Sequence, residues 1–167
     1  MQIEHPLLAQ PMQQRQPQNR GRVFALVQPD PSATNAVVEG TLVLFNSWAR
    51  ILFDTGATHS FIASTFVTSL GLCSETMSDG LIVASPMGGE MIAREVCKSC
   101  VVRLVGQELT TDLMVLDMVG YDVILGMDWL ATHHATVDCY RKRVCIPPAD
   151  GPCYSFVVVW VHLWHLL

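Results

Sequence analysis

The stretch Ile51-Leu52-Phe53-Asp54-Thr55-Gly56-Ala57-Thr58-His59-Ser60 decides the fold, because in it an apolar strand runs directly into an acid and a glycine. Asp54 follows three large apolar residues, so we expect its carboxylate at the end of a buried strand. There, desolvation and neighbouring dipoles can adjust its pKa for proton transfer. Gly56 has no Cβ, so a second backbone or a substrate can approach it closely. An ordinary strand-to-turn junction is the alternative, because Asp and Gly are also favoured in turns.

The residues before Asp54 predict a β-hairpin. Two β-rich runs, 37–45 and 48–53, are separated by the polar pair Asn46-Ser47. This is the pattern of two strands joined by a tight turn. The second strand then leads directly into Asp54.

After the loop, the apolar period changes to that of a helix. Ser60 is a candidate N-cap, and Gly71 is a natural helix terminator. We expect the helix between them to pack its apolar face beneath the loop. That face consists of Phe61, Ile62, Phe66, Val67 and Leu70.

A second hairpin is predicted at residues 81–93. Apolar runs at 81–84 and 91–93 flank a turn rich in Pro and Gly, which is residues 85–89. Taken alone, this pattern favours an ordinary surface hairpin.

The rest of the chain continues mainly as strands, with one further short helix. The strand at 121–125 leads through Gly126 into a helix at 127–133. Asp128 is expected to be a helix N-terminal acid favoured by the dipole, not a second catalytic group, because no glycine follows it. The pair His133-His134 is expected to be exposed at the helix end. The other expected strands are 101–104, 109–116, 135–138 and 144–146, the last two completing the sheet.

Six cysteines, at 73, 97, 100, 139, 145 and 153, are not spaced like a small secreted disulfide framework. No signal-peptide pattern opens the chain, so we expect an intracellular, cytoplasmic protein with free thiols. Cys97 and Cys100 form a Cys-x-x-Cys, whose thiols would point to opposite faces of a strand. A metal site needs about four ligands, and only the loosely placed His133-His134 could complete this one. We therefore expect no metal and no cofactor.

Length and charge bound the possible classes of protein. A chain of 167 residues has the length of one domain, and its net charge of −5 argues against binding to the negatively charged backbone of nucleic acid.

Residues 1–22 are rich in Gln and Pro and predict a disordered linker. Residues 23–148 are the expected domain, and residues 149–167 form a divergent tail. The tail ends in twelve nearly unbroken apolar residues, too few to span a bilayer, which needs about 20. An added strand at a subunit interface, a membrane-surface anchor and out-of-frame sequence all remain open.

The loop around Asp54 resembles the active-site motif of aspartic proteases, in which apolar residues precede Asp-Thr-Gly and a small residue follows. The longer run 52–62 more specifically resembles the retropepsin-like protease domain of plant gypsy-type retrotransposon polyproteins. A second run, Val123-Ile124-Leu125-Gly126-Met127-Asp128-Trp129-Leu130, is similar to the apolar-apolar-Gly segment that threads behind the catalytic loop in this family. The resemblance covers residues 21–147.

This resemblance implies a mostly β, retropepsin-like fold, a closed barrel or sandwich with one or two short helices. It implies that the hairpin at 81–93 is the flap that closes over a bound peptide. The site residues that it implies are Asp54 as the catalytic acid, Thr55, Gly56 and Ala57 as the active-site loop, Ser85, Pro86, Met87, Gly88 and Gly89 as the flap tip, and Ile124, Leu125 and Gly126 as structural support.

The implied activity is hydrolysis of peptide bonds by a homodimer. The chain has one Asp-Thr-Gly, so an Asp54 from each subunit would meet at a two-fold axis, with Thr55 locking the two loops. The substrate would be an extended polypeptide, and the element's own polyprotein is the inferred target. The alternative is an inactive retrotransposon remnant that serves at most as a dimerisation or peptide-binding module. The intact Asp54 and Gly56 favour the enzyme and the unusual C-terminus favours the remnant, while a zinc-binding interaction domain is a distant third possibility.

Overall fold

A computed structural model of the chain describes residues 20–22, 38–85, 89–104, 106–148 and 154–157. Within these residues the chain is mostly β with two short helices, as the sequence predicted. The elements in chain order are β1 (Arg20–Arg22), β2 (Val38–Leu44), β3 (Ser47–Phe53), β4 (Phe61–Ala63), α1 (Ser64–Leu70), β5 (Glu75–Ala84), β6 (Glu90–Leu104), β7 (Gln107–Leu116), β8 (Val123–Leu125), α2 (Met127–Thr132), β9 (Thr136–Asp138), β10 (Arg143–Ile146) and β11 (Tyr154–Val157).

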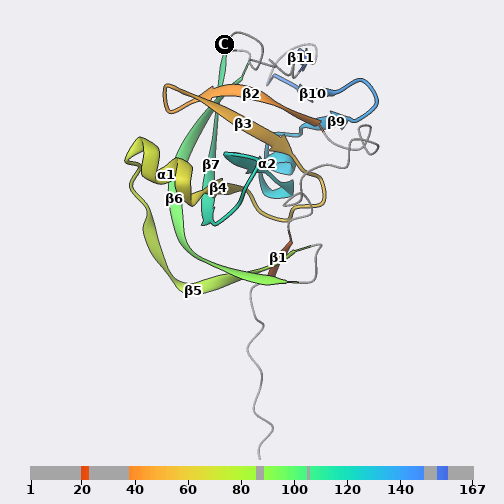
Figure 1. Cartoon of the computed structure of the whole chain (residues 1–167). Coiled ribbons are helices and arrows are strands. Elements are labelled where there is room, and N and C mark those ends of the chain that lie inside the picture. The colour runs from red at the N-terminus through yellow and green to blue at the C-terminus, as the bar shows by residue number, and fades with distance from the viewer. Residues whose placement is uncertain (1–19, 23–37, 86–88, 105, 149–153, 158–167) are drawn as a thin grey trace, which may run out of the picture.

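The strands form two sheets (Figure 1). Eight strands lie in one sheet in the order β1-β5-β6-β7-β4-β8-β3-β2. In the part of the chain that the structure describes, the edge strands β1 and β2 do not pair with each other, because the short β1 pairs only with β5 at the opposite edge. The large sheet is therefore open, and the expected closed barrel is wrong.

The smaller sheet has the order β11-β10-β9. The expectation that 135–138 and 144–146 complete the main sheet is wrong, because β10 pairs with β9 along one edge and with β11 along the other. Strand β1 lies before residue 23 and β11 lies after residue 148, so strand pairing extends past both ends of the expected domain.

The hairpin before Asp54 is confirmed, with its turn one residue earlier than expected. Strands β2 and β3 pair in antiparallel from Val38 opposite Phe53 to Leu44 opposite Ser47. The turn residues Phe45 and Asn46 both have positive φ, 51° and 60°. Positive φ at both central residues is the geometry of the tight hairpin turn that matches the twist of the flanking strands.

The expected helix after the loop is shorter than predicted. Phe61–Ala63 form β4, which pairs with β7 in parallel and with β8 in antiparallel. Helix α1 begins only at Ser64, with Ala63 and not Ser60 as its N-cap, so the predicted cap is wrong. A short apolar run is compatible with either structure, and here pairing on both edges favours the strand. Gly71 ends α1 with a left-handed φ of 61°, as expected.

The second predicted hairpin is also present. Strands β5 and β6 pair in antiparallel up to Ala84 opposite Glu90, and the amide of Ser85 donates to the carbonyl oxygen of Gly89 at 2.8 Å. Figure 1 shows the two strands as a long curved ribbon with β1 beside its end. The predicted tip residues Pro86, Met87 and Gly88 lie outside the described residues.

Cys97 and Cys100 do not point to opposite faces as expected, since both are buried. The register of β6 against β7 shifts between them, and Ser99 in the shift has a φ of 52°. Such a bulge adds a residue to one strand and reverses the alternation of its side chains between the two faces of the sheet. Both thiols are free, whereas Cys145 takes part in a disulfide bond. The expectation of free thiols is wrong for Cys145, because spacing in sequence does not report pairing in space.

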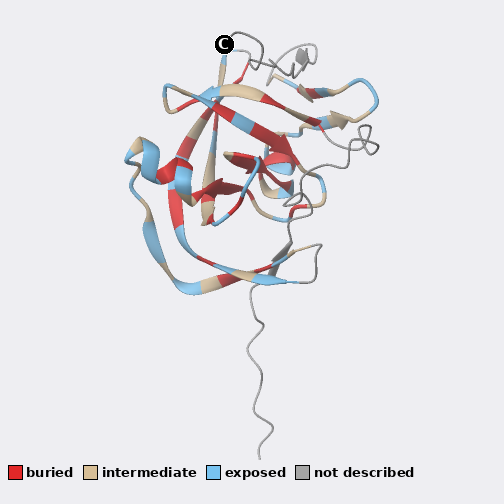
Figure 2. Cartoon of the chain, in the orientation of Figure 1, coloured by how far each residue is buried: buried red, intermediate tan, exposed pale blue. Residues whose placement is uncertain are grey.

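The core lies around the centre of the large sheet. Figure 2 shows the buried residues concentrated on β3, β4 and α2 and recurring at intervals along β6 and β7. Leu52, Ile124 and Trp129 are at most 1% exposed. The last three residues of β3 and all of β8, which lead to Asp54 and Gly126, are buried, so the site between them rests on the core.

Candidate active site

Asp54 lies at the end of a buried strand, as predicted. The three residues before it, Ile51–Phe53, are all buried. Strand β3 runs parallel to β8, with Phe53 opposite Leu125, and the amide of Asp54 donates to the carbonyl oxygen of Leu125 at 3.0 Å. The backbone of Asp54 is therefore held by the neighbouring central strand.

A tight turn orients the Asp54 side chain. The amide of Gly56 donates to Asp54 Oδ1 at 2.8 Å, and the amide of Ala57 donates to the Asp54 carbonyl oxygen at 3.2 Å. Asp54 is half-buried, Ala57 is fully buried, and Thr55 is exposed. The carboxylate is thus fixed by its own loop, while the Thr55 side chain faces outward.

Gly126 supports this loop from behind. A Cβ at Gly126 would lie 2.3 Å from the carbonyl oxygen of His59 and 2.9 Å from that of Ala57. The next amide, of Met127, donates to the Ala57 carbonyl oxygen at 2.8 Å. The two motifs that the sequence singled out therefore meet backbone to backbone, and Leu125 and Gly126 contact the loop that we expected them to support.

Ser60 joins the end of the loop to α2, a contact that sequence reasoning missed. Its hydroxyl donates to Asp128 Oδ1 at 2.6 Å and accepts from the amide of Gly126 at 3.0 Å, while its amide donates to Asp128 Oδ2 at 3.0 Å. Asp128 is in the first turn of α2, as expected. Its carboxylate also binds another chain segment, and no local pattern signals a contact between residues so distant in sequence.

A second set of polar contacts holds the residues just before β8. The Tyr121 hydroxyl donates to the Glu39 carboxylate, and the Arg50 guanidinium lies 5.6 Å from the centre of the Tyr121 ring. Burial, followed by the hydrogen bond to Glu39, raises the pKa of Tyr121 far above its usual range. The amide of Arg50 donates to Asp122 Oδ2 at 2.7 Å. Sequence reasoning missed this group, which ties β2, β3 and the approach to β8 together.

The end of α2 is less exposed than predicted. His133 is half-buried, with its ring centre 5.1 Å from that of Trp129, and its Nε2 donates to the Thr110 carbonyl oxygen at 3.2 Å. The prediction of an exposed His133 is wrong because the Trp129 ring and β7 cover it. His134 is exposed, as expected.

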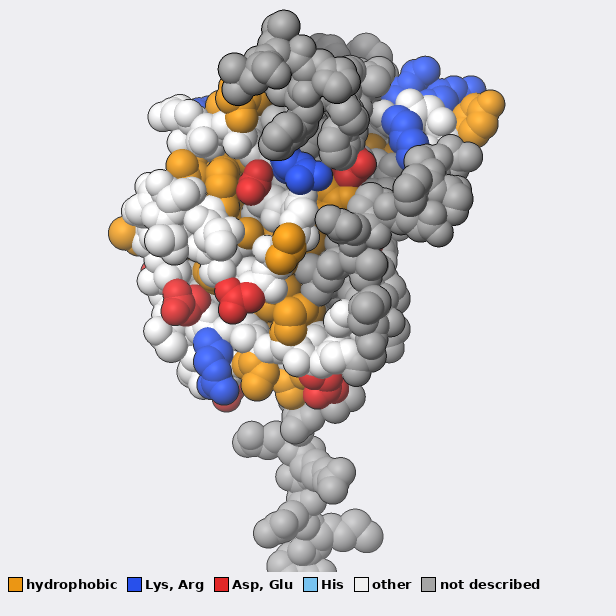
Figure 3. All heavy atoms as spheres, in the orientation of Figure 1, with side chains coloured by type: hydrophobic (Ala, Val, Ile, Leu, Met, Phe, Trp, Pro, Cys, Tyr) orange, Lys and Arg blue, Asp and Glu red, His pale blue; other side chains and the backbone are white. Residues whose placement is uncertain are grey.

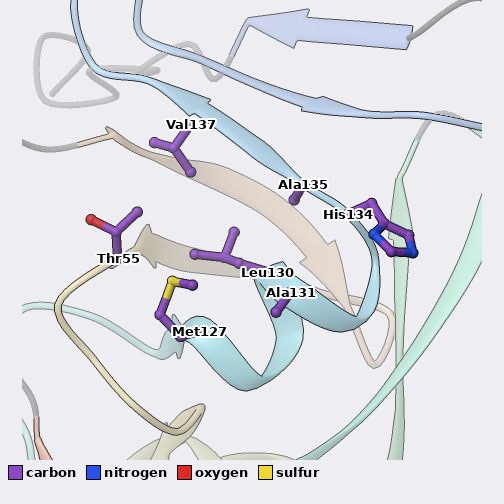
Figure 4. Close-up of a pocket in the computed structure, with 7 residues that line it drawn as sticks. All are labelled: Thr55, Met127, Leu130, Ala131, His134, Ala135 and Val137. Atoms are coloured by element: carbon purple, nitrogen blue, oxygen red, sulfur yellow. The ribbon is translucent and has the colours of Figure 1, made fainter.

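A groove of about 460 Å³ lies beside the loop, between α2 and β9 (Figure 4). Thr55 comes from the loop, and Met127 and Leu130 come from α2. Most of the residues that line it are apolar. The full lining is Thr55, Met127, Leu130, Ala131, His134, Ala135 and Val137.

The structure describes Ser85 and Gly89 of the expected flap, and they close the β5–β6 hairpin as given above. Assignment of this hairpin as a flap stays a prediction. Within the described ranges there is no group of three or more His, Cys, Asp or Glu side chains that could hold a metal ion. Neither described helix has the length and apolar character needed to cross a bilayer.

Charge on the visible surface is mixed. In Figure 3, Lys and Arg side chains gather over the β9–β10 hairpin, while the rest of that face carries separate charges of both signs. The turn of this hairpin contains Arg141 and Lys142, Arg143 is the first residue of β10, and Arg141 is paired with Asp138 at 3.2 Å.

Comparison with known proteins identifies the family. Residues 18–151 match the sequence model of a family described as retroviral aspartyl protease. Among solved structures, the chain is similar to the crystal structure of the retroviral protease-like domain of Ddi1 from Leishmania major, with a TM-score of 0.50 and 18% identity over 66% of this chain and 84% of that one. At this identity the likeness concerns the fold. No match was found among curated proteins. The family match spans both motifs and most of the chain, and the chain therefore belongs to the retroviral aspartyl protease family.

Proposed function

We propose that this protein is an aspartic endopeptidase that acts as a homodimer, with one Asp54 from each subunit in the active site. The observation that carries the proposal is the placement of Asp54 at the end of a buried strand. Its carboxylate accepts from Gly56 at 2.8 Å, and its loop rests on Gly126. Membership of the retroviral aspartyl protease family supports the same reading.

The chemistry needs two carboxylates that share one proton. The ionised carboxylate takes a proton from water as the water attacks the scissile carbonyl carbon, and the protonated one donates a hydrogen bond to the carbonyl oxygen. Each chain contains one Asp-Thr-Gly, so the pair forms only when two chains meet at a two-fold axis. Thr55 is exposed beside Asp54, where its hydroxyl can contact the partner loop.

The proposed substrate is a polypeptide in extended conformation beneath the β5–β6 hairpins of the two subunits. The polyprotein of a gypsy-type retrotransposon is the proposed natural target, which places the reaction inside the cell. The reaction needs no metal and no cofactor, because the carboxylate pair activates the water itself. We propose no role for this domain in binding nucleic acid, in keeping with the net charge of −5.

Cleavage of a mixed peptide library at about pH 5 tests this proposal, with the Asp54→Asn variant as control. The substitution removes the ionisable group with little change in volume, so cleavage should disappear while the circular dichroism spectrum is unchanged. A statine-type inhibitor, which mimics the tetrahedral intermediate, should block the native chain. Absence of cleavage at concentrations where the protein is dimeric would favour the alternative, a non-catalytic dimerisation or peptide-binding module.

A further inference from the structure

Ser60 is a buried polar residue, and its side chain is completely enclosed. All of its polar atoms are bonded. The hydroxyl contacts Asp128 and Gly126, the amide contacts Asp128, and the carbonyl oxygen accepts from the amide of Met114 at 3.0 Å. Ser60 therefore ties the exit of the Asp54 loop to α2 and to β7 at once.

Asp128 is the main hydrogen-bond partner of Ser60. Its carboxylate accepts from the Ser60 hydroxyl, from the Ser60 amide and, at 2.7 Å, from the amide of Trp129. Hydrogen bonds to a charged acceptor are stronger and more directional than neutral ones. Trp129 is 1% exposed and packs with its ring centre 6.0 Å from that of Phe53. The carboxylate is thus anchored to the core on one side and holds Ser60 on the other.

Both ends of the catalytic loop have backbone hydrogen bonds, and the exit has side-chain hydrogen bonds in addition. The entry is held by backbone pairing of Asp54 with Leu125, as in any strand. At the exit, the Ser60 carbonyl oxygen accepts from the Met114 amide, and the Ser60 hydroxyl and the Asp128 carboxylate add side-chain hydrogen bonds to α2. Between these points only Ala57, through Met127, is bonded to the second motif by a backbone hydrogen bond. The position of the Asp54 carboxylate, set by the turn that Gly56 closes, therefore depends on both ends.

We propose that Ser60 and Asp128 are a pair of positioning residues that hold the Asp54 loop in its catalytic geometry. Neither touches the substrate. The pair acts through the backbone from Asp54 to Ser60, and loss of either partner loosens the exit of the loop, while the bond from the Met114 amide to the Ser60 carbonyl oxygen and the rest of the sheet stay in place. The role of the pair in holding the loop follows from the hydrogen bonds alone. Its role in catalysis rests on the proposed function.

Hydrogen exchange of backbone amides in the full chain tests the first part without any need for activity. The variants are Ser60→Ala and Asp128→Asn, the latter preserving side-chain shape and one acceptor oxygen. We expect the amides of Gly56 and Ala57 to exchange at least about tenfold faster in both variants, while the amides of β5 and β6 exchange as in the native chain. Unchanged loop amides, an equal acceleration of all amides, or failure of both variants to fold would overturn the proposal.

A matched control exists in the same part of the chain. The Ser64 hydroxyl donates to the Asp117 carboxylate and likewise joins two separate segments, but this pair is exposed and lies outside the loop. We expect Ser64→Ala and Asp117→Asn to leave the exchange of Gly56 and Ala57 unchanged. Acceleration in these controls equal to that in Ser60→Ala would show a general effect and would overturn the specific role of Ser60.

Kinetics per active site test the second part. The concentration of competent sites is titrated with the statine-type inhibitor, so that unfolded protein does not count. We expect kcat per titrated site to fall about tenfold or more in Ser60→Ala with KM little changed, because small displacements of a catalytic group are costly. The double variant should lose little more than either single one, as for residues that act as a unit. A native kcat per titrated site would overturn the positioning role, whereas an inactive native chain would reject the proposed function and leave the exchange result to decide the role in the loop.

Discussion

The backbones of Gly126 and His59 are in contact, so closely that a Cβ at Gly126 would lie 2.3 Å from the His59 carbonyl oxygen. The obstructing atom belongs to the backbone of the catalytic loop, which cannot rotate away as a side chain does. The two motifs of the sequence are therefore two halves of one structure, and Gly126 is where they meet.

Gly126→Ala should displace the catalytic loop and lower the free energy of unfolding by about 1–3 kcal/mol, the usual range for overpacking. Gly89→Ala is the matched control, because a Cβ there meets no atom within 4 Å, and its stability should stay within about 0.5 kcal/mol of native. Urea denaturation measures both. Equal midpoints for Gly126→Ala and the native chain would refute the close contact.

Thr55→Ala should weaken association of two chains without weakening the single chain. Thr55 is exposed and lines the apolar groove beside the loop, so its removal should change the stability of the monomer by no more than about 0.5 kcal/mol. Sedimentation equilibrium should show a larger dimer dissociation constant. Thr58→Val, an exposed position of the same loop, is the control and should dimerise as the native chain does; indistinguishable dissociation constants for all three would argue against a role of Thr55 between subunits.

Asp112→Asn should lower stability at neutral pH but not at strongly acidic pH. Lys98 Nζ donates to Asp112 at 2.7 Å and the amide of Ser99 donates at 2.9 Å, and these bonds, that of Lys98 first, lower the pKa of Asp112. A carboxyl group with a lowered pKa in the folded state stabilises the fold above its ordinary pKa of about 4, and this contribution is lost as the pH falls through the folded value.

The pair is partly exposed, so the difference from native should be only about 0.2–1 kcal/mol at pH 7 and should vanish below the folded pKa of Asp112. Thermal denaturation across pH measures it. Asp79→Asn, which removes an exposed acid of β5, is the control for loss of a surface charge at pH 7 and should change stability by no more than about 0.5 kcal/mol. A difference that stayed constant down to pH 2 would mean that the ionised form of Asp112 is not what stabilises the bulge.

Alkylation at pH 8 should distinguish the cysteines. Cys73 is exposed, whereas Cys97 and Cys100 are buried, and burial raises the pKa of Cys97 and raises that of Cys100 to about 12. Because the thiolate is the reactive form, iodoacetamide should modify Cys73 first. Cys97 and Cys100 should react only after unfolding, as measured by peptide mass spectrometry. Equal labelling of Cys73 and Cys100 in the native protein would show that the bulge does not bury both thiols.

Local patterns revealed the parts of the site that depend on residue type. Asp54 after an apolar strand, Gly126 before a short helix and the hairpin leading to Phe53 were all predicted from neighbouring residues, and the structure has them. Each of these features is determined by a period or by a glycine within a few positions, which a sequence displays directly.

Features that depend on distant residues could not be predicted in this way. The run from Phe61 to Ala63 becomes a strand because β7 and β8 offer both edges. Ser60 accordingly becomes a junction with Asp128, and not a helix cap. The bulge at Ser99 depends on Asp112, which binds its amide from β7. In each case the deciding partner is remote in sequence.

The most direct test of one Asp54 from each of two chains is a mixing experiment. Native chain and Asp54→Asn are combined at constant total concentration, far above the dimer dissociation constant, and the cleavage rate is measured against the native fraction. If both carboxylates are needed, an equal mixture should retain about one quarter of the native rate, because random pairing leaves that share as native homodimers. A rate of about one half, linear in the native fraction, would show that a single Asp54 suffices and would contradict the dimeric mechanism.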